Sequence, residues 1–199
     1  MKKIPTLFER QYKNHKVVGI ANIVTPGMEW VLEGQGVATV KYDGSCCAII
    51  NGELYKRYDA KHGKKPPEGA IPCCDPDPVT GHHPHWVKVD AKNPDDKWFI
   101  KAFENTMMHS PFSIIDTPVP VTYEALGPHF QGNPYKLPYD RLMLHGNAEI
   151  YVGRSFEEIF EFLRQTPIEG LVFWKDGEPM CKIKRSDFGF EWPVKEEKA

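Results

Sequence analysis

The sequence lacks the features of a membrane or exported protein. No apolar run reaches the roughly 20 residues that a helix needs to cross a bilayer. The charged start Met1-Lys2-Lys3 is not followed by the apolar core of a signal peptide. We therefore expect no membrane association and a cytoplasmic location.

An excess of one charge is also missing. The 199 residues include 25 Lys and Arg against 27 Asp and Glu, which gives a formal net charge of −2. A uniformly basic coat for nucleic acid is thereby excluded, and any phosphate binding must come from local groups of cations. No internal repeat or Ser/Gly linker divides the chain, so we expect one domain over residues 1–199, present as a monomer.

The five cysteines lack the spacing of a disulfide or zinc framework. Four of them form the adjacent pairs Cys46-Cys47 and Cys73-Cys74, and strand neighbours point to opposite faces and bridge poorly. No C-x2-C pair accompanies the three histidines of residues 81–86, so substrate contact or loop packing is favoured there over zinc binding. Free thiols fit a reducing compartment.

Strand patterns dominate what is present. β-branched and apolar residues predict strands at 17–24, 38–40, 46–50, 53–58, 112–115, 119–123, 141–144, 171–174 and 180–184. Asn51-Gly52 and Asp176-Gly177 predict turns between neighbouring strands. Residues 64–94 are rich in proline and predict an irregular excursion.

Two helices are predicted among these strands. Ser155 and Glu158 have the spacing of a capping box, and the apolar residues that follow share one helical face up to Pro167. A weaker helical pattern follows Asp95-Asp96. Several antiparallel hairpins with few helices indicate an α+β fold.

One candidate site lies between two predicted strands, at Lys41-Tyr42-Asp43-Gly44. A Lys at such a corner can project its amine into a cleft, and the Gly lets the backbone approach a ligand closely. A lysine acts as a nucleophile only without its proton, which needs nearby cations or desolvation. Taken alone, the string favours a surface turn with a solvated Lys.

A second candidate is the strand that carries Lys182 and Lys184. These two side chains point to the same side, where two ammonium groups suit a polyphosphate. If the strand pairs with its neighbour through the Asp176-Gly177 turn, Glu169 lies close to both lysines. The alternative is an edge strand that lysines protect from aggregation.

Glu124 and Arg57 complete the candidates. Glu124 ends an apolar strand and could hold a ribose hydroxyl or a metal ion, although a solvated strand end also fits. Arg57 belongs to a basic run over residues 56–65 that could bind a phosphate or a nucleic-acid end. A solvated loop is the alternative for the run.

Taken in order, these pieces resemble the covalent nucleotidyltransferase superfamily of ATP-dependent ligases and mRNA capping enzymes. Motif I resembles Lys41-Tyr42-Asp43-Gly44, and motif III resembles Tyr123-Glu124. Motif IV resembles Glu169-Gly170, and motif V resembles Lys182-Ile183-Lys184.

The string over residues 41–47, Gly132-Asn133-Pro134-Tyr135 and His145-Gly146 more closely resemble the small ATP-dependent RNA ligases of the RNA ligase 1 family. The resemblance implies an α+β nucleotidyltransferase domain without an OB-fold domain. It further implies an enzyme that joins RNA 5′-phosphate and 3′-hydroxyl ends through a lysyl-AMP intermediate on Lys41.

The resemblance also implies a role for each candidate residue. Lys182 and Lys184 would contact the phosphate, and Arg57 and Glu124 would hold the ribose or the neighbouring phosphate. Glu169 would bind the ribose or Mg²⁺ (or Mn²⁺), with Glu124 as a second metal ligand. His145 would line the adenine pocket, or else belong to the core.

Two alternatives remain open for the function. The chain could be another covalent nucleotidyltransferase, either a DNA ligase or a capping guanylyltransferase. It could also be a non-catalytic protein that binds RNA ends.

Overall fold

The computed structural model describes residues 3–14, 16–60, 64–78, 80–111, 114 and 117–195. They divide into two compact units. We name the units by their place in the sequence. The central unit contains Lys3 and Asp43–His145, and the flanking unit contains Ile4–Tyr42 and the described part of Gly146–Ala199. Among the described residues, no helix has both the length and the hydropathy needed to cross a membrane. A single domain over residues 1–199 stays a prediction.

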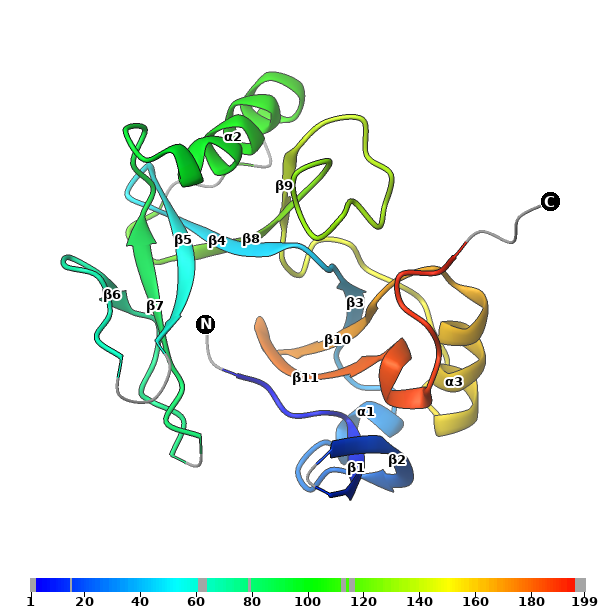
Figure 1. The fold of residues 1–199 in the computed structure, drawn as a ribbon. Helices are drawn as coiled ribbons and strands as arrows, with labels where there is room; N and C mark the ends of the chain where they lie inside the picture. Colours follow the sequence, from blue (N-terminus) through cyan, green and yellow to red (C-terminus); the bar gives the residue numbers. More distant parts are fainter. Residues whose placement is uncertain are drawn as a thin grey trace. The chain divides into compact units, whose positions relative to one another are not determined.

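The central unit is built on a six-stranded antiparallel sheet (Figure 1). Its strands follow the order β6-β7-β5-β4-β8-β9. Their bounds are β4 (Ser45–Ile50), β5 (Glu53–Ala60), β6 (Ile71–Pro72), β7 (His83–Lys88), β8 (Val121–Leu126) and β9 (Arg141–Leu144). Asn51 and Gly52 both take positive φ, as a two-residue hairpin turn requires, and join β4 to β5.

Successive side chains of β4 point to opposite faces of the sheet, and the core of this unit is divided between these two faces. Cys47 and Ile49 pack in one cluster with Ala102 of helix α2 (Lys97–His109), which follows the short helix η1 (Pro94–Asp96). Ala48 and Ile50 pack on the opposite face with Trp86 of β7. The helix predicted after Asp95-Asp96 is thereby confirmed.

The flanking unit contains a three-stranded antiparallel sheet in the order β11-β10-β3 and a separate β1-β2 hairpin (Figure 1). The strands are β1 (Phe8–Lys13), β2 (Lys16–Val24), β3 (Val37–Lys41), β10 (Gly170–Lys175) and β11 (Glu178–Lys184). The helices are α1 (Glu29–Leu32), α3 (Phe156–Gln165) and the short η3 (Arg185–Phe188). Together the two units confirm the predicted α+β fold of antiparallel sheets and few helices.

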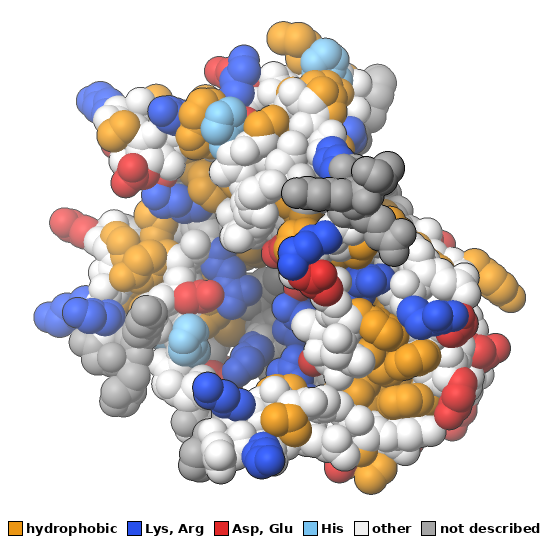
Figure 2. Space-filling model, turned by 45° about the vertical axis from the view of Figure 1, so that its right-hand side comes forward, with side chains coloured by type: hydrophobic (Ala, Val, Ile, Leu, Met, Phe, Trp, Pro, Cys, Tyr) orange, Lys and Arg blue, Asp and Glu red, His pale blue; other side chains and the backbone are white. Residues whose placement is uncertain are grey.

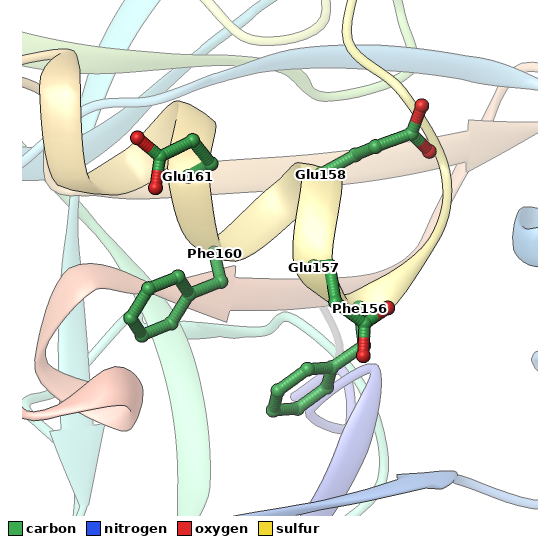
Figure 3. Close-up of a pocket in the computed structure, with 5 residues that line it drawn as sticks. All are labelled: Phe156, Glu157, Glu158, Phe160 and Glu161. Carbon is green, nitrogen blue, oxygen red and sulfur yellow. The ribbon is translucent and has the colours of Figure 1, made fainter.

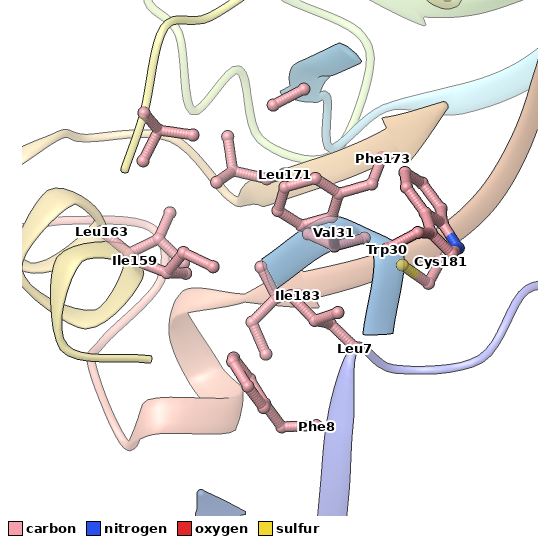
Figure 4. Close-up of a cluster of buried hydrophobic side chains, with 12 residues drawn as sticks. Leu7, Phe8, Trp30, Val31, Ile159, Leu163, Leu171, Phe173, Cys181 and Ile183 are labelled. Atoms are coloured by element: carbon pink, nitrogen blue, oxygen red, sulfur yellow. The ribbon is translucent and has the colours of Figure 1, made fainter. Parts of the chain in front are cut away.

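The core of the flanking unit determines which face of its sheet is polar. Leu171 and Phe173 of β10, and Cys181 and Ile183 of β11, all point into one fully buried cluster (Figure 4). Successive strand residues point to opposite faces. Burial of Cys181 and Ile183 therefore directs Lys182 and Lys184 to the face away from this cluster.

Helix α3 begins at the predicted capping box. The Ser155 hydroxyl accepts a hydrogen bond from Glu158 N at 3.2 Å, and the Glu158 carboxylate accepts one from Ser155 N at 3.0 Å. Ile159 and Leu163 are fully buried in the core. Phe156 and Phe160 lie on one side of the helix, away from Glu158 and Glu161, and contact the Phe188 ring edge-on (Figure 3).

The irregular excursion predicted for residues 64–94 is wrong in part. His83–Lys88 forms β7, which lies between β5 and β6 in the sheet, and Trp86 is 1% exposed. The proline density hid this strand, because Pro84 is accommodated within it opposite Asp59. The strand predicted at 112–115 falls mostly outside the described residues, and the one predicted at 119–123 occurs as β8 over Val121–Leu126.

We expect Ser155→Ala to lower the free energy of unfolding by about 1 kcal/mol, because it removes the acceptor of the N-cap. Urea unfolding of both proteins at the same pH measures the difference. Ser186→Ala, at an exposed serine of the same unit, is the control and should behave as the unchanged protein. Equal stability of Ser155→Ala and the unchanged protein would contradict the assignment.

Candidate functional site

Lys41 and Lys184 lie on either side of one residue of the central strand β10. Gly170 pairs with Lys41 of β3 on one side and with Lys184 of β11 on the other. A Cβ at Gly170 would lie 2.1 Å from the carbonyl oxygen of Ile183. The absence of a side chain at Gly170 is therefore what lets the strands approach at this point.

Glu169 precedes Gly170 and binds both lysines. Lys41 Nζ donates to Oε2 at 2.5 Å, and Lys184 Nζ lies 2.6 Å from Oε1. The carboxylate is only 5% exposed, and a buried charge is costly unless it is paired. Two ammonium groups around one carboxylate leave a positive charge, which suits an anionic ligand.

Lys182 adds a third ammonium group to this cluster. Burial, reinforced by the positive charges of Lys41 and Lys184, lowers the pKa of Lys182 from 10.5 to about 8. The alternative of a free edge strand that its lysines protect does not fit at Lys182: Leu7 N donates to Lys182 O at 2.7 Å, and Lys182 N donates to Pro5 O at 3.0 Å. The N-terminal segment therefore occupies the outer edge of β11 at Lys182.

Asp187 and Arg10 support Lys184, and sequence reasoning missed both. Asp187 is 3% exposed and accepts a hydrogen bond from Lys184 N at 2.9 Å. Arg10 donates to the same carboxylate from Nε at 3.1 Å and from an Nη at 3.0 Å. An Asp three residues after the last strand residue resembles a capping signal, but nothing in the sequence singles out Arg10.

In the central unit, Glu124 is held by a backbone amide and a histidine. Glu124 Oε1 accepts a hydrogen bond from Gly44 N at 3.1 Å, and Oε2 lies 2.9 Å from His145 Nε2. His145 Nδ1 in turn lies 2.9 Å from the Thr122 hydroxyl. Two residues that the sequence nominated separately, Glu124 and His145, are therefore direct partners.

The turn Asp43-Gly44 is held by the loop that contains Gly132-Asn133-Pro134-Tyr135. Asp43 N donates to the Tyr135 hydroxyl at 2.8 Å, and Gln131 Nε2 donates to Gly44 O at 3.3 Å. Two sequence segments that resemble RNA ligases, residues 41–47 and 132–135, are thus in contact in the structure. Sequence reasoning gave no contact role to Tyr135 or Gln131.

Arg57 lies on β5 opposite Trp86, and its Nε donates to Asp59 at 2.8 Å. It lines a pocket of the central unit together with Cys74 and His82. Of the basic run over residues 56–65, Lys56 forms an ion pair with Asp96, and residues 61–63 lie outside the described residues.

The structure thus forms two groups from the predicted site residues. Lys41 and Lys184 both bind Glu169 in the flanking unit beside Lys182, and Glu124 binds His145 in the central unit. Arg57 pairs with Asp59. On the face shown in Figure 2, Lys and Arg side chains are interspersed with Asp and Glu side chains, in line with the net charge of −2.

Comparison with known proteins finds similarity to proteins named RNA ligase 1. The Danio rerio protein is 26% identical in an alignment 222 positions long. The alignment covers 79% of this chain and 68% of that protein. The Rattus norvegicus protein is 27% identical in an alignment 224 positions long. The alignment covers 79% of this chain and 69% of that protein. No protein-family profile matches the chain.

We expect Gly170→Ala to lower the free energy of unfolding by about 1–3 kcal/mol, because the new methyl group meets backbone rather than a movable side chain. Gly19→Ala is the matched control on β2, since its Cβ would lie 3.7 Å from the nearest atom, Gln11 Oε1. Chemical unfolding of both variants decides the point, and equal effects of the two substitutions would contradict the close approach at Gly170.

The lowered pKa of Lys182 predicts a pH dependence of stability. Between about pH 8 and 10.5 the unfolded chain binds the proton that the folded chain has released, so stability rises with pH across this window. Without nucleotide, Lys182→Gln should be stabilised relative to the unchanged protein near pH 7, and its advantage should shrink towards about pH 10.

The measurement is the difference in unfolding free energy between the two proteins at each pH. Lys16→Gln, at an exposed lysine of the same unit, should show no such trend. A constant difference for Lys182→Gln across the range would contradict the lowered pKa.

Proposed function

We propose that this protein is an ATP-dependent RNA ligase that joins RNA 5′-phosphate and 3′-hydroxyl ends through a lysyl-AMP intermediate on Lys41. The contact of Lys41 and Lys184 with the buried carboxylate of Glu169 carries the proposal. The similarity to two proteins named RNA ligase 1 supports the choice of an RNA ligase over other nucleotidyltransferases.

In the first step, the Lys41 amine attacks the α-phosphorus of ATP. A nitrogen–phosphorus bond forms, the bond from that phosphorus to the bridging oxygen breaks, and pyrophosphate leaves. Lys41 must lose a proton to react in this way. Glu169 Oε2, at 2.5 Å from Lys41 Nζ, is the nearest acceptor for that proton.

Lys182 and Lys184 supply the positive charge that this step needs. Negative charge on the phosphate is best stabilised by cations that are already in place. Lys184 is held through its backbone by Asp187 and through its side chain by Glu169. Lys182 carries its charge at neutral pH, because its lowered pKa of about 8 still lies above neutrality.

Two further steps complete the reaction. An oxygen of the RNA 5′-phosphate takes the AMP from Lys41, which restores the amine and forms a 5′–5′ diphosphate bond. The RNA 3′-hydroxyl then attacks the 5′-phosphate, the new phosphodiester bond forms, and AMP leaves. The same lysines serve each step, because every step develops charge on a phosphate.

Glu169 and Glu124 each offer carboxylate oxygens, the donors that Mg²⁺ and Mn²⁺ prefer, and we propose each of them as a ligand to such an ion. Such an ion would neutralise charge on the ATP phosphates. We assign Arg57 and Glu124 to the ribose or a neighbouring phosphate, and His145 to the adenine or to the orientation of Glu124. The five free thiols fit a reducing, cytoplasmic compartment, and we further propose that the protein is a monomer.

The choice of nucleotide separates the ligase from a capping guanylyltransferase. AMP from ATP that carries the label on its α-phosphate should become covalently attached to the protein, and GMP from GTP labelled in the same way should not. Sealing of nicked RNA but not nicked DNA should then distinguish it from a DNA ligase. Labelling by GTP alone would contradict the proposal, and RNA binding without labelling by ATP would favour a non-catalytic RNA-end-binding protein.

We expect Lys41→Ala to abolish attachment of AMP, and Lys41→Arg not to restore it, because a guanidinium group stays protonated. Intact mass measured after incubation with ATP and Mg²⁺ shows the added AMP, which pyrophosphate should remove from the unchanged protein. Lys175→Ala, at the other end of β10, is the matched control and should be labelled normally. AMP attached to either Lys41 variant would refute the assignment.

A further inference from the structure

We propose that Cys46, Glu124 and His145 form a binding site for a Zn²⁺-class transition-metal ion. The Cys46 Sγ, a Glu124 carboxylate oxygen and a His145 ring nitrogen all lie within 4.8 Å of one another. All three side chains are half-buried. The site lies within the central unit and shares Glu124 and His145 with the proposed ligase site, but its metal binding is measured without any ligation.

Three neighbouring strands bring these ligands together. Cys46 of β4 pairs directly with Glu124 of β8, and His145 follows the last residue of β9. His145 N donates to Thr122 O at 3.1 Å, which fixes the backbone beside the ring. Cys47 points to the opposite face and is fully buried in the core, so the adjacent Cys pair contributes one thiol to the site.

The hydrogen bonds around His145 and Glu124 prepare two of the ligand atoms. When Nδ1 donates its proton to the Thr122 hydroxyl at 2.9 Å, the lone pair of Nε2 points at Glu124 Oε2, also at 2.9 Å. A cation then takes the place that a proton would otherwise occupy between nitrogen and oxygen. Metal-binding histidines are commonly oriented in this way through their second nitrogen.

The donor set selects the kind of ion. One thiolate, one imidazole and one carboxylate suit Zn²⁺ and Co²⁺, whereas Mg²⁺ prefers oxygen ligands alone. Tetrahedral coordination with bonds of about 2.0–2.3 Å places ligand atoms roughly 3.5 Å apart, so small side-chain rotations suffice. Three protein ligands leave the fourth position open to water or to a ligand oxygen.

The ion would offset what keeps the Cys46 thiol protonated. Burial, with the Glu124 carboxylate as a further cause, raises the pKa of the Cys46 thiol to about 12. A divalent ion reverses this effect and binds the thiolate, so the thiol proton is released on binding.

Co²⁺ is the probe for the test, because a thiolate bound to Co²⁺ gives a charge-transfer absorption band. The full chain, freed of nucleotide with pyrophosphate, should bind one equivalent of Co²⁺ with this band, and Zn²⁺ should abolish it. Cys46→Ser should lose the band, and Cys74→Ser, a half-buried cysteine of the same unit, should keep it. Absence of the band, or its survival in Cys46→Ser, would overturn the proposal.

A second measurement on the unchanged protein guards against a variant that fails to fold. Zn²⁺ at ten times its dissociation constant should slow alkylation of Cys46 by about tenfold, and alkylation of Cys74 should not change. Mass spectrometry of the digested protein reports each cysteine separately. Protection of Cys74 but not Cys46 would assign the ion to the Cys73-Cys74 segment and refute the site.

Discussion

The candidate site of the flanking unit depends on the charge of one buried carboxylate. Glu169 is almost inaccessible, and the ammonium groups of Lys41 and Lys184 compensate its charge from the strands on either side. Burying this carboxylate without the lysines would cost several kcal/mol. The ion contacts therefore align the ends of β3 and β11 while they hold the Lys41 amine that we propose as the nucleophile, so that the structure and the proposed chemistry use the same side chains.

Much of this site follows from sequence periodicity. The alternation over residues 180–184 predicts one face for Lys182 and Lys184, and the Asp176-Gly177 turn predicts the pairing that brings Glu169 near them. The contact of Lys41 with Glu169 needed more information, because β3 and β10 are separated by more than a hundred residues. Only the ordered motifs pointed to it, and periodicity says nothing about partners so distant in the chain.

Other features left no local signal. Arg10 binds Asp187 from a hairpin near the other end of the chain. The Tyr135 hydroxyl accepts a hydrogen bond from Asp43 N, and it belongs to a loop in which four residues of 131–136 have positive φ. Strand β7 was missed because Pro84 and its neighbouring prolines outweigh the apolar signal of Trp86 and Val87. In each case a tertiary contact decides the structure, and the local residue types alone favour something else.

Glu169 and Glu124 show how surroundings give one residue type two kinds of chemistry. Glu169 is enclosed by ammonium groups that donate and cannot accept hydrogen bonds, so it holds two cations that we propose bind a phosphate. Glu124 meets a thiol, an imidazole and a backbone amide, and we propose that it binds a metal ion together with the thiol and the imidazole. The sequence identifies both as glutamates at strand ends, and the neighbouring strands determine what each carboxylate can bind.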